Sequence, residues 1–286
     1  MSRIAAGMWR LAEWGMNPAQ RLAFVEHAIE RGVTSFDHAD IYGDYAVEAL
    51  FGEALALKPS IRQHIELVSK CGIALRSDRR PAHALKHYDT STRHIVDSVE
   101  QSLSALRTDR LDLLLIHRPD PLLDLDEVAE AFVRLRREGK VLHFGVSNFT
   151  PWQFQALSSS VRLVTNQVEF SPLRLDPLID GTFDQLQALG ASPMIWSALG
   201  GGKLFAGTEP AAARIRAAVE TLAQALEVSP ATVIYAWILR LPSKPIVLTG
   251  SQRPGVLDEA VAATGLRLTT QQWFTLYEAC LGHEVP

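Results

Sequence analysis

Residues 111–119 read LDLLLIHRP, a short apolar run that ends in a histidine, an arginine and a proline. A continuous apolar run of this length is typical of a buried strand in a parallel sheet. Seven other short runs resemble it, and longer stretches with apolar residues at three- and four-residue spacing separate them. The predicted strands are Ile4–Gly7, Ser35–Asp37, Glu66–Ser69, Leu111–Ile116, Leu142–Val146, Val164–Gln167, Met194–Trp196 and Ile246–Leu248.

The longer stretches predict helices, and several of them begin with a capping signal. Asn17, Thr150 and Ser229 each precede a proline, which suits a helix with proline at its first position. Gly32 and Gly139 follow charged residues in the manner of helix C-caps. The predicted helices are Ala19–Arg31, Tyr45–Leu57, Thr92–Leu106, Glu127–Glu138, Pro151–Leu157, Phe183–Leu189, the stretch from Glu209 to Leu239, and Thr269–Leu281.

Eight strands alternating with helices predict parallel pairing through right-handed crossovers. A closed (β/α)8 barrel of the TIM type accounts for the count, and the chain is close in length to such barrels. An open doubly wound sheet is less suitable, because no Gly-x-Gly-x-x-Gly turn follows the first strand. With no linker or shift in composition, we expect one domain over residues 1–286, with an extra C-terminal helix and loops at Pro81–Tyr88 and Ala198–Pro210.

Charge and composition favour a small molecule as the partner. The formal net charge is −4, and no block of positive charge suggests nucleic acid or a membrane surface. Cys71 and Cys280 form neither a metal pair nor a disulfide framework. No apolar leader and no uninterrupted apolar window of about 18 residues is present, so we expect a cytoplasmic protein without a membrane span. The helical exterior of a barrel can associate, but nothing in the sequence requires it, so we expect a monomer.

Polar residues appear where each predicted strand ends. In a β/α barrel these ends meet at one mouth, where the active site of the fold lies. A lysine there would be costly unless an acid such as Asp37 paired with it. An ammonium near Tyr42 would lower the pKa of the phenol and make it a proton donor, while His117 could orient a carbonyl. The residues concerned are Asp37, His38, Asp40, Tyr42, Ser69, Lys70, Cys71, His117, Arg118, Ser147, Asn148, Asn166, Gln167, Trp196, Ser197, Thr249, Gly250 and Ser251.

Taken together, these residues suit the reduction of a C=O group. Each alone has a plainer reading: an ion pair, an amphipathic tyrosine, a core histidine or turn chemistry. The sequence resembles the aldo-keto reductase superfamily, as a bacterial-type member, over nearly its whole length. The stretches that carry the resemblance are Phe36–Gly43 (FDHADIYG), Ser69-Lys70, Leu111–Pro119 (LDLLLIHRP), Gly145–Phe149 (GVSNF) and Asn166–Glu169 (NQVE).

The resemblance implies an NAD(P)H-dependent oxidoreductase that interconverts carbonyl and alcohol groups. Tyr42 would be the general acid and base, Lys70 and Asp37 would tune it, and His117 would position the carbonyl. The substrate wall would include Trp9, Tyr42, Cys71, His117 and Arg118. The cofactor would contact Gly7, Met8, Trp9, Asp37, Ser147, Asn148, Gln167, Trp196, Ser197, Leu199, Gly200, Gly201, Lys203, Thr249, Gly250, Ser251 and Arg253.

Two departures from the family pattern bear on the site. His38 replaces the usual threonine after the strand-two aspartate, and this adds a titratable group near the rim. Gly255 occupies the position of a basic residue that holds the 2′-phosphate of NADP in many members. Arg253 could take that role, because a guanidinium suits phosphate. We therefore expect NADP(H), with NAD(H) as the alternative.

Two other functions compete with the reductase. A metal-dependent barrel hydrolase could use Asp37, His38, Asp40, His117 and His143 as ligands. It leaves Lys70 and Tyr42 unexplained, and His143 lies near the start of its strand. The second alternative is a cofactor-sensing regulatory protein of the same fold with little turnover.

Overall fold

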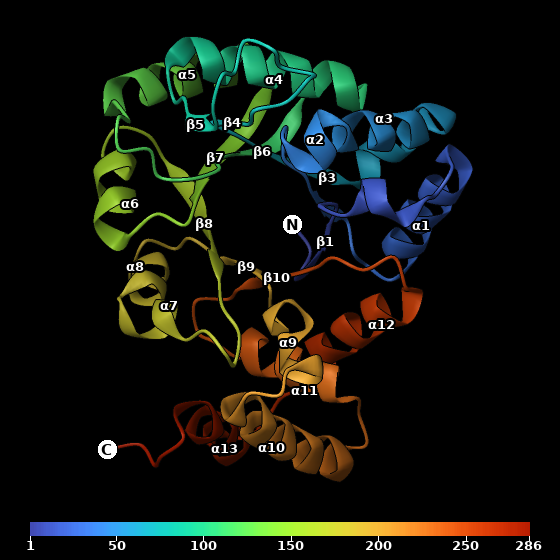
Figure 1. Cartoon of the computed structure of the whole chain (residues 1–286), viewed down its shortest axis with the longest axis vertical. Helices are drawn as coiled ribbons and strands as arrows, with labels where there is room; N and C mark the ends of the chain where they lie inside the picture. Colours follow the sequence, from blue (N-terminus) through green and yellow to red (C-terminus); the bar gives the residue numbers. More distant parts are fainter.

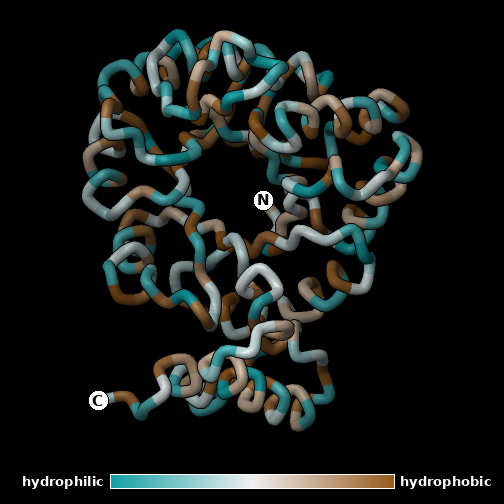
Figure 2. Tube along the Cα trace, viewed as in Figure 1, coloured by the Kyte–Doolittle hydropathy of each residue, from teal (hydrophilic) through white to brown (hydrophobic).

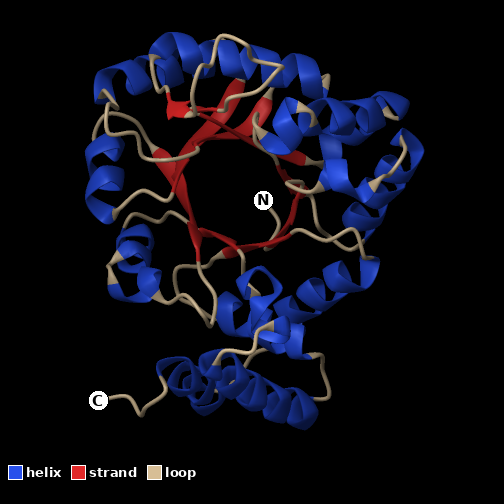
Figure 3. Ribbon diagram, in the orientation of Figure 1, coloured by secondary structure: helices blue, strands red, loops and turns tan.

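The computed structural model describes all residues from Met1 to Pro286. Eight parallel strands close into a barrel in the order β1-β10-β9-β8-β7-β6-β3-β2, which confirms the predicted fold (Figure 3). Each predicted strand is present, with its ends shifted by no more than a few residues. The barrel strands are β1 (Ile4–Gly7), β2 (Ser35–Asp37), β3 (Glu66–Cys71), β6 (Leu111–Ile116), β7 (Val141–Ser147), β8 (Leu163–Glu169), β9 (Met194–Trp196) and β10 (Ile246–Thr249).

Helices surround the barrel on all sides, and α10 and α13 pack together outside this ring (Figure 1). Hydrophobic and hydrophilic residues alternate along the surrounding helices (Figure 2), as expected where one face covers the barrel and the other meets water. The helices are α1 (Pro18–Glu30), α2 (Tyr42–Tyr45), α3 (Val47–Leu57), α4 (Thr92–Leu106), α5 (Leu125–Arg137), α6 (Pro151–Ser158), α7 (Asp176–Ile179), α8 (Thr182–Ala188), α9 (Lys203–Ala206), α10 (Pro210–Leu226), α11 (Pro230–Leu239), α12 (Pro254–Ala262) and α13 (Thr270–Leu281).

The predicted capping signals are confirmed. The side chain of Asn17 accepts a hydrogen bond from the backbone of Gln20, and Thr150 caps α6 in the same way. Ser229 accepts from the backbone N–H of Thr232 at the start of α11. These side chains satisfy backbone donors that a helix leaves free in its first turn.

Several segments differ from the prediction, and four of them border or extend predicted elements. The stretch from Glu209 to Leu239 is two helices, α10 and α11, bent by 96° and separated where Ser229 and Pro230 begin the second. The expected loop Pro81–Tyr88 contains strand β5 (His87–Tyr88), which pairs antiparallel with β4 (Ile73–Ala74). A short helix, α9, follows a 3-10 turn in the expected loop Ala198–Pro210. Helix α12 was not predicted, although Pro254 at its first position is a usable signal.

Strand alternation separates two cores. Side chains that point into the barrel form a small apolar cluster below the mouth, composed of Ala5, Val68, Leu113, Leu115, Met194 and Ile246. Side chains that point outward join the large core between strands and helices. Gly145 permits close packing inside the barrel, because a Cβ there would lie 2.7 Å from Thr165 and 2.8 Å from Leu115.

His38 belongs to the outer core and not to the rim where we expected it. Asp37 points into the barrel, so the next side chain points outward, and the His38 ring meets Phe51 of α3 with the ring centroids 4.5 Å apart. Both ring nitrogens are buried without a hydrogen-bond partner. Burial, and then the nearby charge of Lys70, lowers the pKa of His38 to about 3. The imidazole therefore fills space as a neutral ring.

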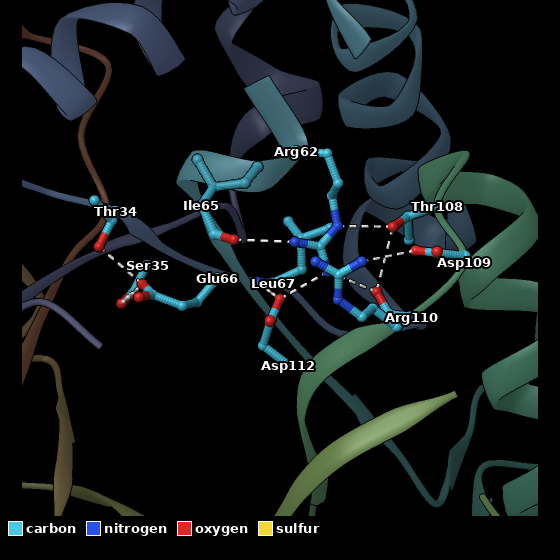
Figure 4. A network of polar contacts seen from close by, with 10 residues as sticks. All are labelled: Thr34, Ser35, Arg62, Ile65, Glu66, Leu67, Thr108, Asp109, Arg110 and Asp112. Atoms are coloured by element: carbon cyan, nitrogen blue, oxygen red, sulfur yellow. Dashed lines mark hydrogen bonds and ion pairs between the residues drawn. The ribbon is translucent and has the colours of Figure 1, made fainter. Parts of the chain in front are cut away.

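The opposite end of the barrel is held by polar contacts among the starts of β2, β3 and β6 (Figure 4). Arg62 donates to the Thr108 hydroxyl at 2.7 Å, to the Ile65 carbonyl at 3.0 Å and to the Arg110 carbonyl at 2.8 Å. It also pairs with Asp112 at 2.8 Å, and the same carboxylate oxygen accepts from the backbone of Leu67. Glu66 similarly accepts from Thr34 and Ser35. Polar groups at this end of a β/α barrel contribute to stability.

None of the helices is by itself long and apolar enough to cross a membrane; α10 and α11 meet the length and composition criteria only as a bent pair.

Replacing Arg62 with methionine should destabilise the protein by about 3 kcal/mol, because Asp112 and two carbonyls lose a largely buried partner. Urea unfolding at pH 7.5 measures the change. The control is Arg93→Met, which removes an exposed ion pair with Asp97 and should cost less than about 1 kcal/mol. Equal effects of the two variants would contradict this role for Arg62.

The buried neutral His38 predicts acid sensitivity. Its pKa is lowered on folding, so its contribution to stability is complete above the unfolded-state pKa near 6.5 and is lost as the pH falls toward 3. Between pH 7 and pH 5 the wild type should lose about 2 kcal/mol more unfolding free energy than His38→Leu. Urea unfolding of the wild type and of His38→Leu at both pH values tests this. A His38→Leu variant with the wild-type dependence would show that His38 does not titrate on unfolding.

Candidate active site

The mouth of the barrel collects polar side chains at the carboxyl ends of five strands. Asp37 closes β2, Lys70 lies near the end of β3, and His117 directly follows β6. Ser147 closes β7 and Gln167 lies near the end of β8. All five side chains are buried. By strand alternation they point inward, above the apolar cluster that fills the barrel.

Lys70 is the centre of this group. Its Nζ donates to Asp37 Oδ2 at 2.7 Å, to the carbonyl of His38 at 2.7 Å and to the Tyr42 hydroxyl at 3.0 Å. These contacts use all three ammonium protons, which is the condition for keeping a charge in a buried site. Burial lowers the pKa of Lys70, but Asp37 and Tyr42 oppose it and the net pKa is above the ordinary value. The group is therefore a buried ammonium paired with a carboxylate.

Tyr42 does not have the lowered pKa that the sequence suggested. Burial raises the pKa of the phenol, and although Lys70 lowers it, the net pKa is above 10. The hydroxyl is therefore protonated at neutral pH. The sequence argument considered only the charge of Lys70 and omitted the larger cost of placing a phenolate in a buried site.

His117 lies beside Tyr42, with the two ring centroids 5.9 Å apart and the planes at 75°. Burial first, and then Lys70, Arg118 and Lys86, hold the pKa of His117 well below its usual value. The imidazole is therefore neutral at physiological pH. A neutral imidazole with one N–H can donate a hydrogen bond to an oxygen without transferring its proton.

Four residues on the far side of the mouth form a row of hydrogen bonds that is linked to the ion pair. Gln167 Nε2 donates to Asp37 Oδ1 at 2.7 Å, and the Ser147 hydroxyl donates to the carbonyl of Gln167 at 3.0 Å. Asn148 Nδ2 donates to the Ser147 hydroxyl at 2.8 Å, and Trp196 Nε1 donates to Asn148 Oδ1 at 3.3 Å. Asn148 has a positive φ of 59°, a conformation that asparagine tolerates better than most residues. The result is a continuous row of hydroxyl and amide groups.

The third side of the mouth is formed by loops after β9 and β10. Gly200, Gly201 and Gly202 all have positive φ, and Ser197 has a φ of 54°. Leu199 is half-buried beside them, and Lys203 at the start of α9 is exposed. Gly7 lies against Thr249 and Gly250, where a Cβ would come within 3.5 Å of the Thr249 carbonyl. Ser251 accepts from the backbone of Arg253, whose side chain is exposed at the start of α12.

The structure does not bring every predicted side chain to the mouth. The side chains of Cys71 and Met8 are buried in the outer core. Thr249 is buried next to Val247 and Leu248 at the end of β10, and its hydroxyl interacts with Tyr235 of α11. Alternation is the reason, because Lys70 points inward and its neighbour Cys71 must point outward. Cys71 is thus excluded from the substrate wall, whereas Trp9 is exposed and Arg118 is half-buried beside His117.

Three residues near the mouth, Tyr45, Arg80 and Lys86, were not predicted. The Tyr45 hydroxyl accepts from the backbone of Leu75 at 2.8 Å, and Arg80 lies 4.7 Å from the Tyr45 ring centroid. These contacts hold the segment between β4 and β5 against the turn that follows Tyr42. Lys86, in the same segment, is close enough to act on the pKa of His117. Hydrophobic periodicity carries no signal for either contact, because both depend on a long-range approach of two loops.

The residues considered as metal ligands are dispersed. His38 faces Phe51, and His143 is exposed in the first half of β7. No group of three or more His, Cys, Asp or Glu side chains has an arrangement that could hold a metal ion. The hydrolase alternative therefore lacks its ligand set.

Comparison with known proteins agrees with this geometry. The model of the aldo/keto reductase family matches residues 3–280. The chain is 51% identical to the oxidoreductase YdhF of Escherichia coli, over 100% of this chain and 95% of that protein. It is 43% identical to a 6-dehydroglucose reductase of Agrobacterium fabrum, over 100% and 96% of the two chains.

Solved structures share the fold. A glycerol dehydrogenase from Gluconobacter oxydans superimposes with a TM-score of 0.85 at 24% identity, over 99% of this chain and 92% of that one. A thermostable aldo-keto reductase solved with the inhibitor epalrestat gives 0.82 at 23% identity, over 98% and 95%. The family match and the full-length relatives establish that this chain belongs to the aldo/keto reductase family of NAD(P)H-dependent oxidoreductases.

Proposed function

We propose that the protein uses NADPH to reduce an aldehyde or ketone to an alcohol, with Tyr42 as the proton donor. The observation that carries the proposal is the position of the Lys70 ammonium, which contacts both Asp37 and the Tyr42 hydroxyl next to a neutral His117. In the balanced reaction a hydride adds to the carbonyl carbon, the C=O pair moves to oxygen, and that oxygen takes the proton of Tyr42.

Tyr42 is suited to give up a proton only while a substrate oxygen is becoming negative. Burial keeps the phenol protonated beforehand, and the Lys70 ammonium at 3.0 Å stabilises the phenolate that forms. Asp37 keeps Lys70 charged throughout. The neutral His117 donates a hydrogen bond to the substrate oxygen and so orients the carbonyl.

The donor set on the far side of the mouth fits a nicotinamide carboxamide. Ser147, Asn148 and Gln167 present hydroxyl and amide groups that can both donate and accept, as a carboxamide requires. The half-buried Trp196 offers a ring for stacking, and the bound nicotinamide supplies the hydride. Gln167 also donates a hydrogen bond to Asp37, so the residue that holds the carboxamide would also hold the Asp37–Lys70 ion pair in position.

The remaining cofactor contacts follow from the loops. Ser197, Leu199, Gly200 and Gly201 would border the pyrophosphate, and the exposed Lys203 would pair with its charge. Gly7, Met8, Thr249 and Gly250 would contact the cofactor through backbone groups, and Ser251 would do so through its hydroxyl. Arg253 is exposed at the start of α12, and its guanidinium would hold the 2′-phosphate of NADP. Trp9 and Arg118 border the substrate. Because one relative is named a 6-dehydroglucose reductase, sugar aldehydes belong in the first substrate panel.

Tyr42→Phe should keep cofactor affinity and lower kcat for reduction by about 100- to 10,000-fold, because the hydroxyl that donates the proton is removed. NADPH fluorescence titration measures binding, and NADPH oxidation with a panel of aldehydes measures turnover. Tyr277→Phe, a change on α13 far from the mouth, is the matched control. A Tyr42→Phe enzyme with unchanged kcat would remove Tyr42 from this role.

Arg253→Ala should weaken NADPH binding by about 10-fold and leave NADH binding almost unchanged, since only NADPH has a 2′-phosphate. Tryptophan quenching and nicotinamide fluorescence give both dissociation constants, with the exposed Arg267→Ala as control. Equal losses for the two cofactors would show that Arg253 does not recognise the phosphate. Tight cofactor binding with slow turnover of every carbonyl would instead favour the regulatory alternative.

A further inference from the structure

Arg118 places a guanidinium at the barrel mouth in direct contact with residues of the candidate site. Its side chain is half-buried. Nη1 donates to the carbonyl of His117 at 2.8 Å and reaches the Ser147 hydroxyl at 3.4 Å. The guanidinium therefore lies between the residue proposed to bind the substrate oxygen and a residue proposed to bind the nicotinamide. Its charge also lowers the pKa of Tyr42, which places it near the third reacting group.

No protein group neutralises this cation. Nε and Nη2 of Arg118 make no hydrogen bond, and no carboxylate lies within ion-pair distance. The acid nearest to Arg118 in the sequence is Asp120, and its carboxylate already accepts hydrogen bonds from the Thr90 hydroxyl and the backbone N–H of Leu122. The half-buried guanidinium thus has hydrogen-bond partners on Nη1 but no counter-ion, so the free side of the fork is available to a ligand.

The surrounding charge is positive as well. The groups that act on the pKa of His117, after burial, are Lys70, Arg118 and Lys86, and all three lower it. Lys70 is paired with Asp37, but Lys86 is exposed and has no ion-pair partner. An electron-rich group next to the substrate carbonyl would therefore meet a favourable potential at this point.

We propose that Arg118 selects carbonyl compounds that carry an acceptor oxygen on the carbon next to the carbonyl, and that it binds a carboxylate there most strongly. The proposal rests on the proposed function, since it places the reacting carbonyl at Tyr42 and His117. A planar guanidinium matches a carboxylate through two parallel hydrogen bonds, and a hydroxyl through one. An alkyl group in the same place leaves the donors unsatisfied. Substrates of the 2-oxo acid type are thus preferred over hydroxyketones, and hydroxyketones over plain ketones.

The test uses three ketones of similar size: pyruvate, hydroxyacetone and butanone. Arg118→Met should lower kcat/KM for pyruvate by about 10- to 100-fold and for hydroxyacetone by about 2- to 10-fold, chiefly through KM. For butanone the change should stay below about 2-fold, and any general effect of the lost charge on Tyr42 appears equally in all three. Arg118→Lys keeps the charge without the fork and should give intermediate losses for pyruvate. Arg93→Met, on the outer face of α4, is the matched control and should leave all three unchanged.

Binding gives a readout that does not need turnover. Oxamate, which carries a carboxylate next to an amide carbonyl, should bind the NADP⁺-loaded wild type in calorimetry and bind Arg118→Met about 10- to 100-fold more weakly. Equal losses for the three ketones, or oxamate binding that is absent or insensitive to Arg118, would overturn the proposal. If the wild type reduces butanone and simple aldehydes, and Arg118→Met changes its activity on no ketone selectively, this inference is wrong and the reductase proposal stands. If the wild type reduces no carbonyl at all, the reductase proposal is wrong. The oxamate titration then still decides the role of Arg118.

Discussion

The buried ion pair between Lys70 and Asp37 is the contact on which the site depends. An ammonium without solvent carries a large desolvation cost, which only well-placed acceptors can offset. Here the acceptors come from separate parts of the chain: Asp37 and the His38 carbonyl from the end of β2, and Tyr42 from the turn beyond it. Any displacement of β2 against β3 would leave a buried charge unpaired. The pair therefore fixes the local geometry as well as the charge.

The same carboxylate extends the network across the barrel. Asp37 accepts from Lys70 on one oxygen and from Gln167 on the other. In the order of the strands, β8 lies opposite β2, so this bond spans the mouth. It joins the proton-donor side to the row of Ser147, Asn148 and Trp196. The apolar cluster beneath keeps water from the base of the site, and the charges are consequently stronger there than at a surface.

Outside the barrel wall, a second set of ionisable groups is buried, and there burial favours the neutral form of each group. Burial raises the pKa of Asp40 and of Glu48, whose carboxylate accepts from Ser69 at 2.5 Å. Burial of His38 produces a neutral imidazole. The motif Phe36–Gly43 thus alternates between two environments. Asp37 pairs with Lys70 inside the barrel, whereas His38 faces Phe51 in the apolar layer behind it. Residues adjacent in the chain differ in chemistry because the pleat of the strand sends them to different faces.

Much of this protein could be predicted from its sequence. Eight apolar runs separated by amphipathic stretches predicted the closed barrel, because strands buried on both faces need helices to cover them. Polar residues at the strand ends predicted the site, because parallel strands place these ends together. The resemblance to the aldo-keto reductases assigned the roles that remain proposals here.

The tertiary structure alone decided which of those residues share a space. It placed Cys71, Met8 and His38 in the outer core, although each adjoins a residue of the mouth. It raised the pKa of Tyr42, because burial outweighs the charge of Lys70. It left Arg118 without a counter-ion and brought Lys86 near His117. These outcomes depend on distances between distant segments and on how much water each group loses, and neither quantity is written in a local pattern of residues.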